Sequence, residues 1–218
     1  MPINKEREYR NMTIRTAEFT DDSGEKKIVT GYASTFDQPY LLYNGDGWQY
    51  WEVVDRSAFD NTDMSDVIMQ YDHEGRVFAR TRNNTLEVYP DNEGLFIQAD
   101  LGGTELGRGL YEEIRGGYTD RMSFGFTVNG DFEEKRKTEE GVTIYTRHIT
   151  SVGKLYDVSA VSIPANDGTS IEADAVTRSI GDLCDGVIAR VQAERLEEER
   201  LALERRRTEV RARALGKE

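Results

Sequence analysis

The stretch that most constrains the fold runs from Tyr118 to Asn129 and alternates between apolar and small or polar residues. Successive side chains of a strand point to opposite faces, so two faces can be read from it. The apolar face would hold Met122, Phe124, Phe126 and Val128, and the other face Ser123, Gly125 and Thr127. A glycine inside a strand often marks close approach of a ligand or another backbone. The stretch therefore predicts a strand whose open face surrounds a single hydroxyl.

Further short segments with strand character are separated by turn signals such as Asn83-Asn84 and Pro90-Asp91-Asn92-Glu93. They cover residues 12–20, 27–36, 50–54, 67–71, 77–82, 85–89, 94–101, 142–149 and 155–163. Between them we expect a loop at 37–48, a hairpin tip at 133–141 and a bulge at Gly153. Ser57 is expected to cap a short helical turn. About nine strands favour a mainly β fold with few helices, an antiparallel barrel or sandwich.

The segment from Thr104 to Arg115 changes period, because its apolar residues recur every four positions. Thr104 can cap a helix there, and Gly116-Gly117 can end it. We therefore expect an amphipathic helix that leads into the Ser123 strand.

The charge is unevenly distributed over the 218 residues, whose net charge is -13. From residue 179 onward nine acidic and nine basic side chains cancel, so the whole excess lies on residues 1–178. An acidic body argues against nucleic acid as the main partner.

No apolar run approaches the roughly 18 residues of a membrane span, and the N-terminus lacks the apolar core of a secretory signal. The single cysteine, Cys184, fits a reducing compartment.

The segment from Ile180 is helical in pattern and rich in Arg, Glu, Leu and Ala. Leu196, Leu203 and Val210 fall seven residues apart, but Glu and Arg fill the second seam position that a coiled coil needs to be apolar. We therefore divide the chain into a β domain, 1–178, and a charged helical arm, 179–218, that is either solvated or docks a partner.

Candidate chemistry depends on two histidines, His73 and His148. A serine nucleophile needs a base, usually histidine, and that base needs a third group to orient it. Asp157 is a carboxylate within an apolar strand, where an unpaired charge is costly, and Asp72 competes for the same role. With two histidines and no cysteine cluster, a catalytic zinc site is not expected. No phosphate-binding glycine motif is present, and no carboxylate pair is singled out for glycoside hydrolysis.

Several motifs occur in an order that resembles the prohead (capsid maturation) protease family of tailed bacteriophages. They are G-Y-A-S-T-F (31–36), E-V-V-D-R-S-A-F (52–59), Q-Y-D-H (70–73), R-T-R-N-N-T-L (80–86), G-L-F-I (94–97), R-M-S-F-G-F (121–126) and L-Y-D-V-S-A-V-S-I-P-A-N (155–166). The resemblance covers about residues 28–170. The chain departs from the family pattern at Ser57, where glycine is frequent, and near Gly153, where one residue is extra.

The resemblance implies a fold similar to the herpesvirus assembly protease, an antiparallel β-barrel flanked by helices. Matched motif by motif, Ser123 would be the nucleophile, His73 the base and Asp157 the third member. Because the herpesvirus relatives use a second histidine in that place, His148 stays an alternative to Asp157. Oxyanion donors are expected near Ser123 or in the turn 164–168.

The resemblance also implies a maturation endopeptidase that acts inside the assembling procapsid, in the host cytoplasm. Its expected partners are the major capsid protein with its scaffold segment and other copies of itself, through self-cleavage or a homo-oligomer; we expect no cofactor, metal, nucleic acid or membrane. The arm would enter the shell with scaffold or capsid subunits, or be cut off. Two alternatives remain: a non-catalytic assembly protein that retains the fold, and a different hydrolase using the same Ser–His pair.

Overall fold

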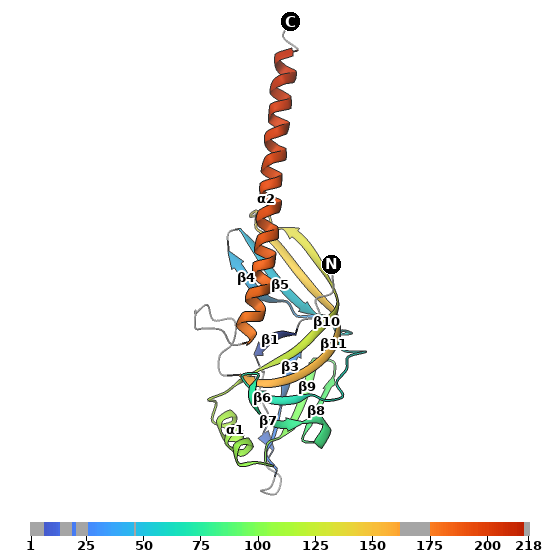
Figure 1. Ribbon diagram of the computed structural model, residues 1–218, viewed down its shortest axis with the longest axis vertical. Coiled ribbons are helices and arrows are strands. Elements are labelled where there is room, and N and C mark those ends of the chain that lie inside the picture. The colour runs from blue at the N-terminus through green and yellow to red at the C-terminus, as the bar shows by residue number, and fades with distance from the viewer. Residues whose placement is uncertain (1–6, 14–18, 21–25, 46, 162–174, 216–218) are drawn as a thin grey trace. The chain divides into compact units, whose positions relative to one another are not determined.

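The computed structural model describes residues 7–13, 19–20, 26–45, 47–161 and 175–215. The chain forms two compact units, Met1–Ile180 and Gly181–Glu218. The described residues form two sheets, two α-helices and a 3-10 turn (Thr81–Asn83), so the fold is mainly β as expected (Figure 1).

The larger sheet has seven strands, with five in the order β1-β10-β11-β5-β4 and β6 and β7 branching from β11. Its strands are β1 (Glu8–Thr13), β4 (Tyr40–Gly45), β5 (Trp48–Val54), β6 (Ile68–Tyr71), β7 (Glu74–Arg80), β10 (Arg121–Lys137) and β11 (Thr143–Val161). The smaller sheet has the order β2-β3-β9-β8. It comprises β2 (Phe19–Thr20), β3 (Ile28–Thr35), β8 (Leu86–Pro90) and β9 (Gly94–Asp100).

The hairpin of β10 and β11 is the longest element pair of the fold, and in Figure 1 both strands curve along the larger sheet. Residues 143–149 of β11 pair with β5, whereas residues 157–160 pair with β6. The two segments predicted at 142–149 and 155–163 are thus one strand. Gly153 has no partner in the register, where Thr127 pairs with Lys154 and Val128 with Val152, so the expected bulge is confirmed.

Other sequence expectations are corrected. The hairpin tip is shorter than 133–141, because Thr138 N–H bonds the carbonyl of Val142 at 2.8 Å and both strands run up to this turn. The predicted loop 37–48 contains β4, whose pairing with β5 the weak local pattern did not reveal. Around Ser57 the chain makes turns, with Asp60 N–H on the Ser57 carbonyl, and no helix.

The barrel expectation is only partly met. The pairing of β11 with β5 and its pairing with β6 are both parallel. No closed ring of paired strands is present among the described residues. Parallel pairs require long connections between the strands, which a reading of neighbouring segments does not detect.

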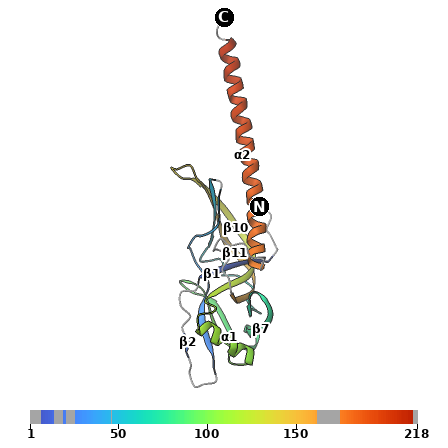
Figure 2. The ribbon, with the colours of Figure 1, turned by 90° about the vertical axis from the view of Figure 1, so that its left-hand side faces the viewer.

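The core lies between the sheets and the helix. Phe124 and Phe126 of β10 stack at 4.6 Å between ring centroids, and Ile97 of β9 packs into the same cluster. The helix α1 (Glu105–Arg115) adds Leu110 and Ile114 and lies next to β7 (Figure 2). Its start is confirmed by the Thr104 side chain, which accepts the N–H of Gly107 at 2.9 Å.

The arm is the helix α2 (Ala175–Leu215), and its start lies five residues before the predicted one. Arg200 bonds Glu197 and Glu204, as ion pairs three and four residues apart should. Leu196, Leu203 and Val210 are exposed, as expected for a helix without an apolar seam. No helix of the described residues is long and apolar enough to cross a membrane.

Candidate active site

Ser123 lies in the middle of the larger sheet, on β10. It pairs with Asn11 of β1 on one side and with Ser159 of β11 on the other. Its neighbours Phe124 and Met122 point into the core, so the hydroxyl projects to the opposite face, as the alternation predicts. The residue is fully buried.

His73 lies in the two-residue turn between β6 and β7. Asp72 and His73 have φ of 49° and 60°, the left-handed conformation that both central residues of a type I′ turn require. Neither residue is a glycine, so the turn stores backbone strain of about 1–2 kcal/mol per residue. The Asp72 N–H bonds the Ala160 carbonyl of β11 at 2.9 Å and fixes this strained turn against the sheet. Backbone strain of this kind is concentrated at functional sites.

Asp157 lies on β11, between the strands that position the other two groups. It pairs with Gly125 of β10 and with Ile68 of β6. Its carboxylate is fully buried but well satisfied: it accepts from the Ser159 hydroxyl at 2.7 Å, from His73 and from the guanidinium of Arg7. A buried carboxylate needs such partners, because an unpaired charge in the interior is costly.

The three side chains form one hydrogen-bonded line. The Ser123 Oγ lies 2.6 Å from Nε2 of His73, and Nδ1 of His73 lies 2.5 Å from Oδ1 of Asp157. They are far apart in sequence, and three neighbouring strands bring them together. Because Asp157 bonds Nδ1, the imidazole is held with Nε2 facing the hydroxyl.

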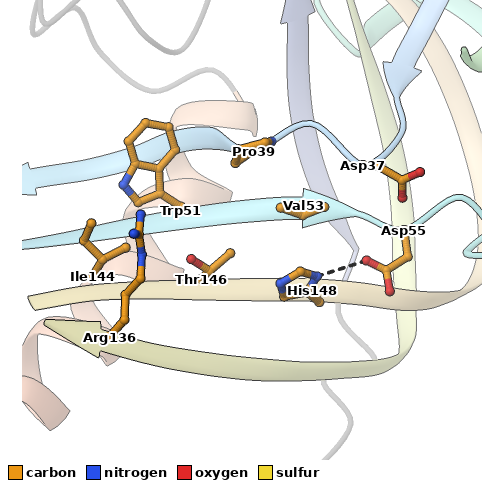
Figure 3. Close-up of a pocket in the computed structure, with 9 residues that line it drawn as sticks. All are labelled: Asp37, Pro39, Trp51, Val53, Asp55, Arg136, Ile144, Thr146 and His148. Atoms are coloured by element: carbon orange, nitrogen blue, oxygen red, sulfur yellow. Dashed lines mark hydrogen bonds and ion pairs between the residues drawn. The ribbon is translucent and has the colours of Figure 1, made fainter. Parts of the chain in front are cut away.

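Of the two alternatives for the third member, His148 lies away from this line of contacts. His148 also belongs to β11, but its Nδ1 is 3.1 Å from Asp55 and its ring stacks on Phe132. It lines a separate pocket, with a volume of about 410 Å3, together with Trp51 and Val53 (Figure 3). Asp72 contributes its backbone to the turn, as described above.

Two residues at the site were missed by the sequence reasoning. Ser159 lies two residues after Asp157, so strand periodicity could have placed it on the same face. Arg7 is 150 residues from Asp157 in sequence, and no local pattern could have indicated the contact.

The turn 164–168, considered for the oxyanion hole, lies outside the described residues. Among those residues, no cluster of His, Cys, Asp or Glu could hold a metal ion.

A hydroxyl, an imidazole and a carboxylate in this order are the arrangement that serine hydrolases use. A model of the caudovirus prohead serine proteases matches residues 11–183, and the chain therefore belongs to this family of phage proteases, which acts in capsid maturation. This confirms the resemblance in the sequence motifs.

Among solved structures, the capsid assembly protease of bacteriophage T4 is similar to the chain. The two are 12% identical, and the match covers 73% of this chain and 99% of that chain with a TM-score of 0.37. No curated protein matches.

Proposed function

We propose that the chain is an active prohead maturation endopeptidase with Ser123 as nucleophile, His73 as general base and Asp157 as the orienting carboxylate. The observation that carries the proposal is the line of contacts at 2.6 Å and 2.5 Å through the two ring nitrogens of His73. Family membership supplies the reaction class, cleavage of peptide bonds.

In the first step, His73 Nε2 takes the hydroxyl proton while Ser123 Oγ bonds the scissile carbonyl carbon. The Asp157 carboxylate stabilises the imidazolium that forms. The carbon–nitrogen bond then breaks, and the leaving amine takes the proton from His73. Water, with His73 again as base, hydrolyses the acyl ester and regenerates the serine hydroxyl.

The substrate that we propose is the scaffold region of the major capsid protein, cut inside the procapsid in the host cytoplasm, followed by the protease itself. This extends the family's role in capsid maturation to this chain. A non-catalytic assembly protein would have no need of the strained His73 turn or of the buried carboxylate behind it.

The test is co-expression with the capsid protein of the same phage, followed by mass spectrometry of both chains. Ser123→Ala should leave the scaffold segment uncut, because loss of the nucleophile costs about six orders of magnitude in rate. The control is Ser57→Ala, a change at an exposed serine, which should process normally. Normal trimming by the Ser123→Ala protein would reject the nucleophile. A serine-reactive phosphonate should also label the wild type stoichiometrically, and no label would favour the non-catalytic alternative.

A further inference from the structure

The strand β1 lies directly on the edge of β10 that carries the nucleophile. It runs antiparallel, with Asn11 opposite Ser123, Arg10 opposite Phe124 and Thr13 opposite Arg121. With β11 on the other side, β10 has no free edge at Ser123. The serine is consequently fully buried, although a peptidase must bring a substrate carbonyl against this hydroxyl.

Residues 7–13, which are β1 and the residue before it, contact two of the three site residues. The carbonyl oxygen of Arg10 accepts a hydrogen bond from Ser123 Oγ at 2.8 Å, and the guanidinium of Arg7 pairs with Oδ2 of Asp157. A serine hydroxyl has one proton to donate. While it donates to Arg10, it does not donate to His73, and the first step of the reaction cannot begin.

The side chains of Glu8 and Arg10 on β1 are held by a buried set of charges. Arg10 is fully buried and bonds Glu52 through Nε at 2.5 Å and Nη2 at 2.9 Å. Glu8 accepts from Arg147 at 2.8 Å, and Arg147 in turn bonds Glu52 at 3.0 Å. Glu52 and Arg147 therefore present one acidic and one basic group to alternate residues of a strand that pairs with β10.

We infer that the edge of β10 from Arg121 to Phe126 is the place where a substrate strand binds, and that residues 7–13 occupy it in the substrate's absence. Extended peptides commonly bind proteins by adding a strand to a sheet edge, with alternate side chains read by pockets. The inference rests on the proposed function, since it assigns a substrate site next to Ser123.

The side chains of the segment 7–13, which occupies the edge of β10, indicate the chemistry of the substrate. The residue whose carbonyl faces Ser123 carries a basic side chain that reaches Glu52, as Arg10 does. The residue two positions earlier carries an acidic side chain that reaches Arg147, as Glu8 does. The substrate is thus an extended segment of a protein with an acidic-x-basic sequence, cut after the basic residue. β1 and substrate exclude each other, so activity requires β1 to leave the edge.

A disulfide between β1 and β10 tests this directly. Thr13→Cys with Arg121→Cys, in a Cys184→Ser background, joins two directly opposed residues of an antiparallel pair, whose Cα separation of about 5 Å suits a disulfide. The oxidised protein should cleave a peptide with the sequence of residues 4–14 at least about ten-fold more slowly than the reduced protein. Reductant should restore the rate. Thr13→Cys alone, treated identically, should not change. Equal rates in both redox states would overturn the inference.

A pair of quenched fluorescent peptides tests the charge selection. The first has the chain's own sequence from residues 4 to 14, N-K-E-R-E-Y-R-N-M-T-I, and the second carries Arg10→Glu. The wild type should cut the first between the residues matching Arg10 and Asn11, with kcat/KM at least about ten-fold above that for the second. Equal or reversed preference would overturn the inference. If the wild type cuts neither peptide and takes no phosphonate label, the proposed function itself has failed, and the inference fails with it.

Discussion

At the residue scale, the site depends on which group holds the far nitrogen of His73. Asp157 reaches it at 2.5 Å, whereas His148 bonds Asp55 and stacks on Phe132. The two candidates are nine positions apart on β11, roughly 30 Å along an extended strand. A role for His148 in orienting His73 would need a rearrangement of the whole sheet.

This geometry predicts opposite results for two substitutions. Asp157→Asn should lower kcat by about four orders of magnitude near neutral pH, because an amide stabilises the wrong tautomer of His73. His148→Gln should leave kcat within about two-fold. The measurement is steady-state cleavage of a peptide by both variants, with thermal unfolding to show that each is folded. A loss of activity in His148→Gln with an active Asp157→Asn would reverse the assignment.

At the element scale, the close contact of two strands depends on a residue without a side chain. Gly94 begins β9 and pairs with Thr35 of β3. A Cβ added to Gly94 would lie 1.9 Å from the carbonyl oxygen of Ser34, a backbone atom that cannot turn aside. Only glycine allows this approach, which sets the spacing of the smaller sheet.

Gly94→Ala should therefore destabilise the fold. Overpacking of this kind costs about 1–3 kcal/mol, or roughly 2–9 °C in Tm for a unit of this size. Gly103→Ala is the matched control, because a Cβ there would meet no atom within 4 Å. Differential scanning fluorimetry should show a lower Tm for the first variant alone. An unchanged Tm in Gly94→Ala would mean that the two strands separate easily.

At the scale of the whole molecule, buried charges join strands that are distant in sequence. Glu8 on β1 accepts from Arg10 and from Arg147 on β11, and both guanidinium groups reach Glu52 on β5. Burial raises the pKa of Glu8, but the positive charges of Arg10 and Arg147 outweigh it, so the pKa is lowered from 4.5. Breaking a buried pair on one side leaves an uncompensated charge, which is strongly destabilising.

The sign of this shift gives a pH prediction. A carboxyl with a lowered folded-state pKa contributes its full stability above its unfolded pKa of 4.5 and loses it as the pH falls toward the folded-state value. Glu8→Gln should lower Tm at neutral pH, and its Tm should depend less on pH than that of the wild type below about pH 4.5. Thermal unfolding across an acid series provides the measurement. Parallel curves for the two proteins would show that Glu8 does not titrate with folding.

The sequence by itself determined the local features. Alternation placed Ser123 on a strand with its hydroxyl away from the core, and the period of four predicted α1 with its Thr104 cap. Gly153, between two segments of strand character, indicated the bulge. The motifs were sufficient to indicate the family. These features depend on neighbours a few residues apart, which is the range over which side-chain periodicity and turn chemistry act.

Only the tertiary structure decided which distant residues meet. It brought His73 and Asp157 together across 84 residues and placed Arg7 beside a carboxylate 150 residues away. It also joined β11 to β5 and β6 in parallel, which replaced the expected closed antiparallel barrel with two sheets in the described part of the chain. Strand pairing is fixed by burial of whole faces and by long connections, and neither leaves a signal within a single segment.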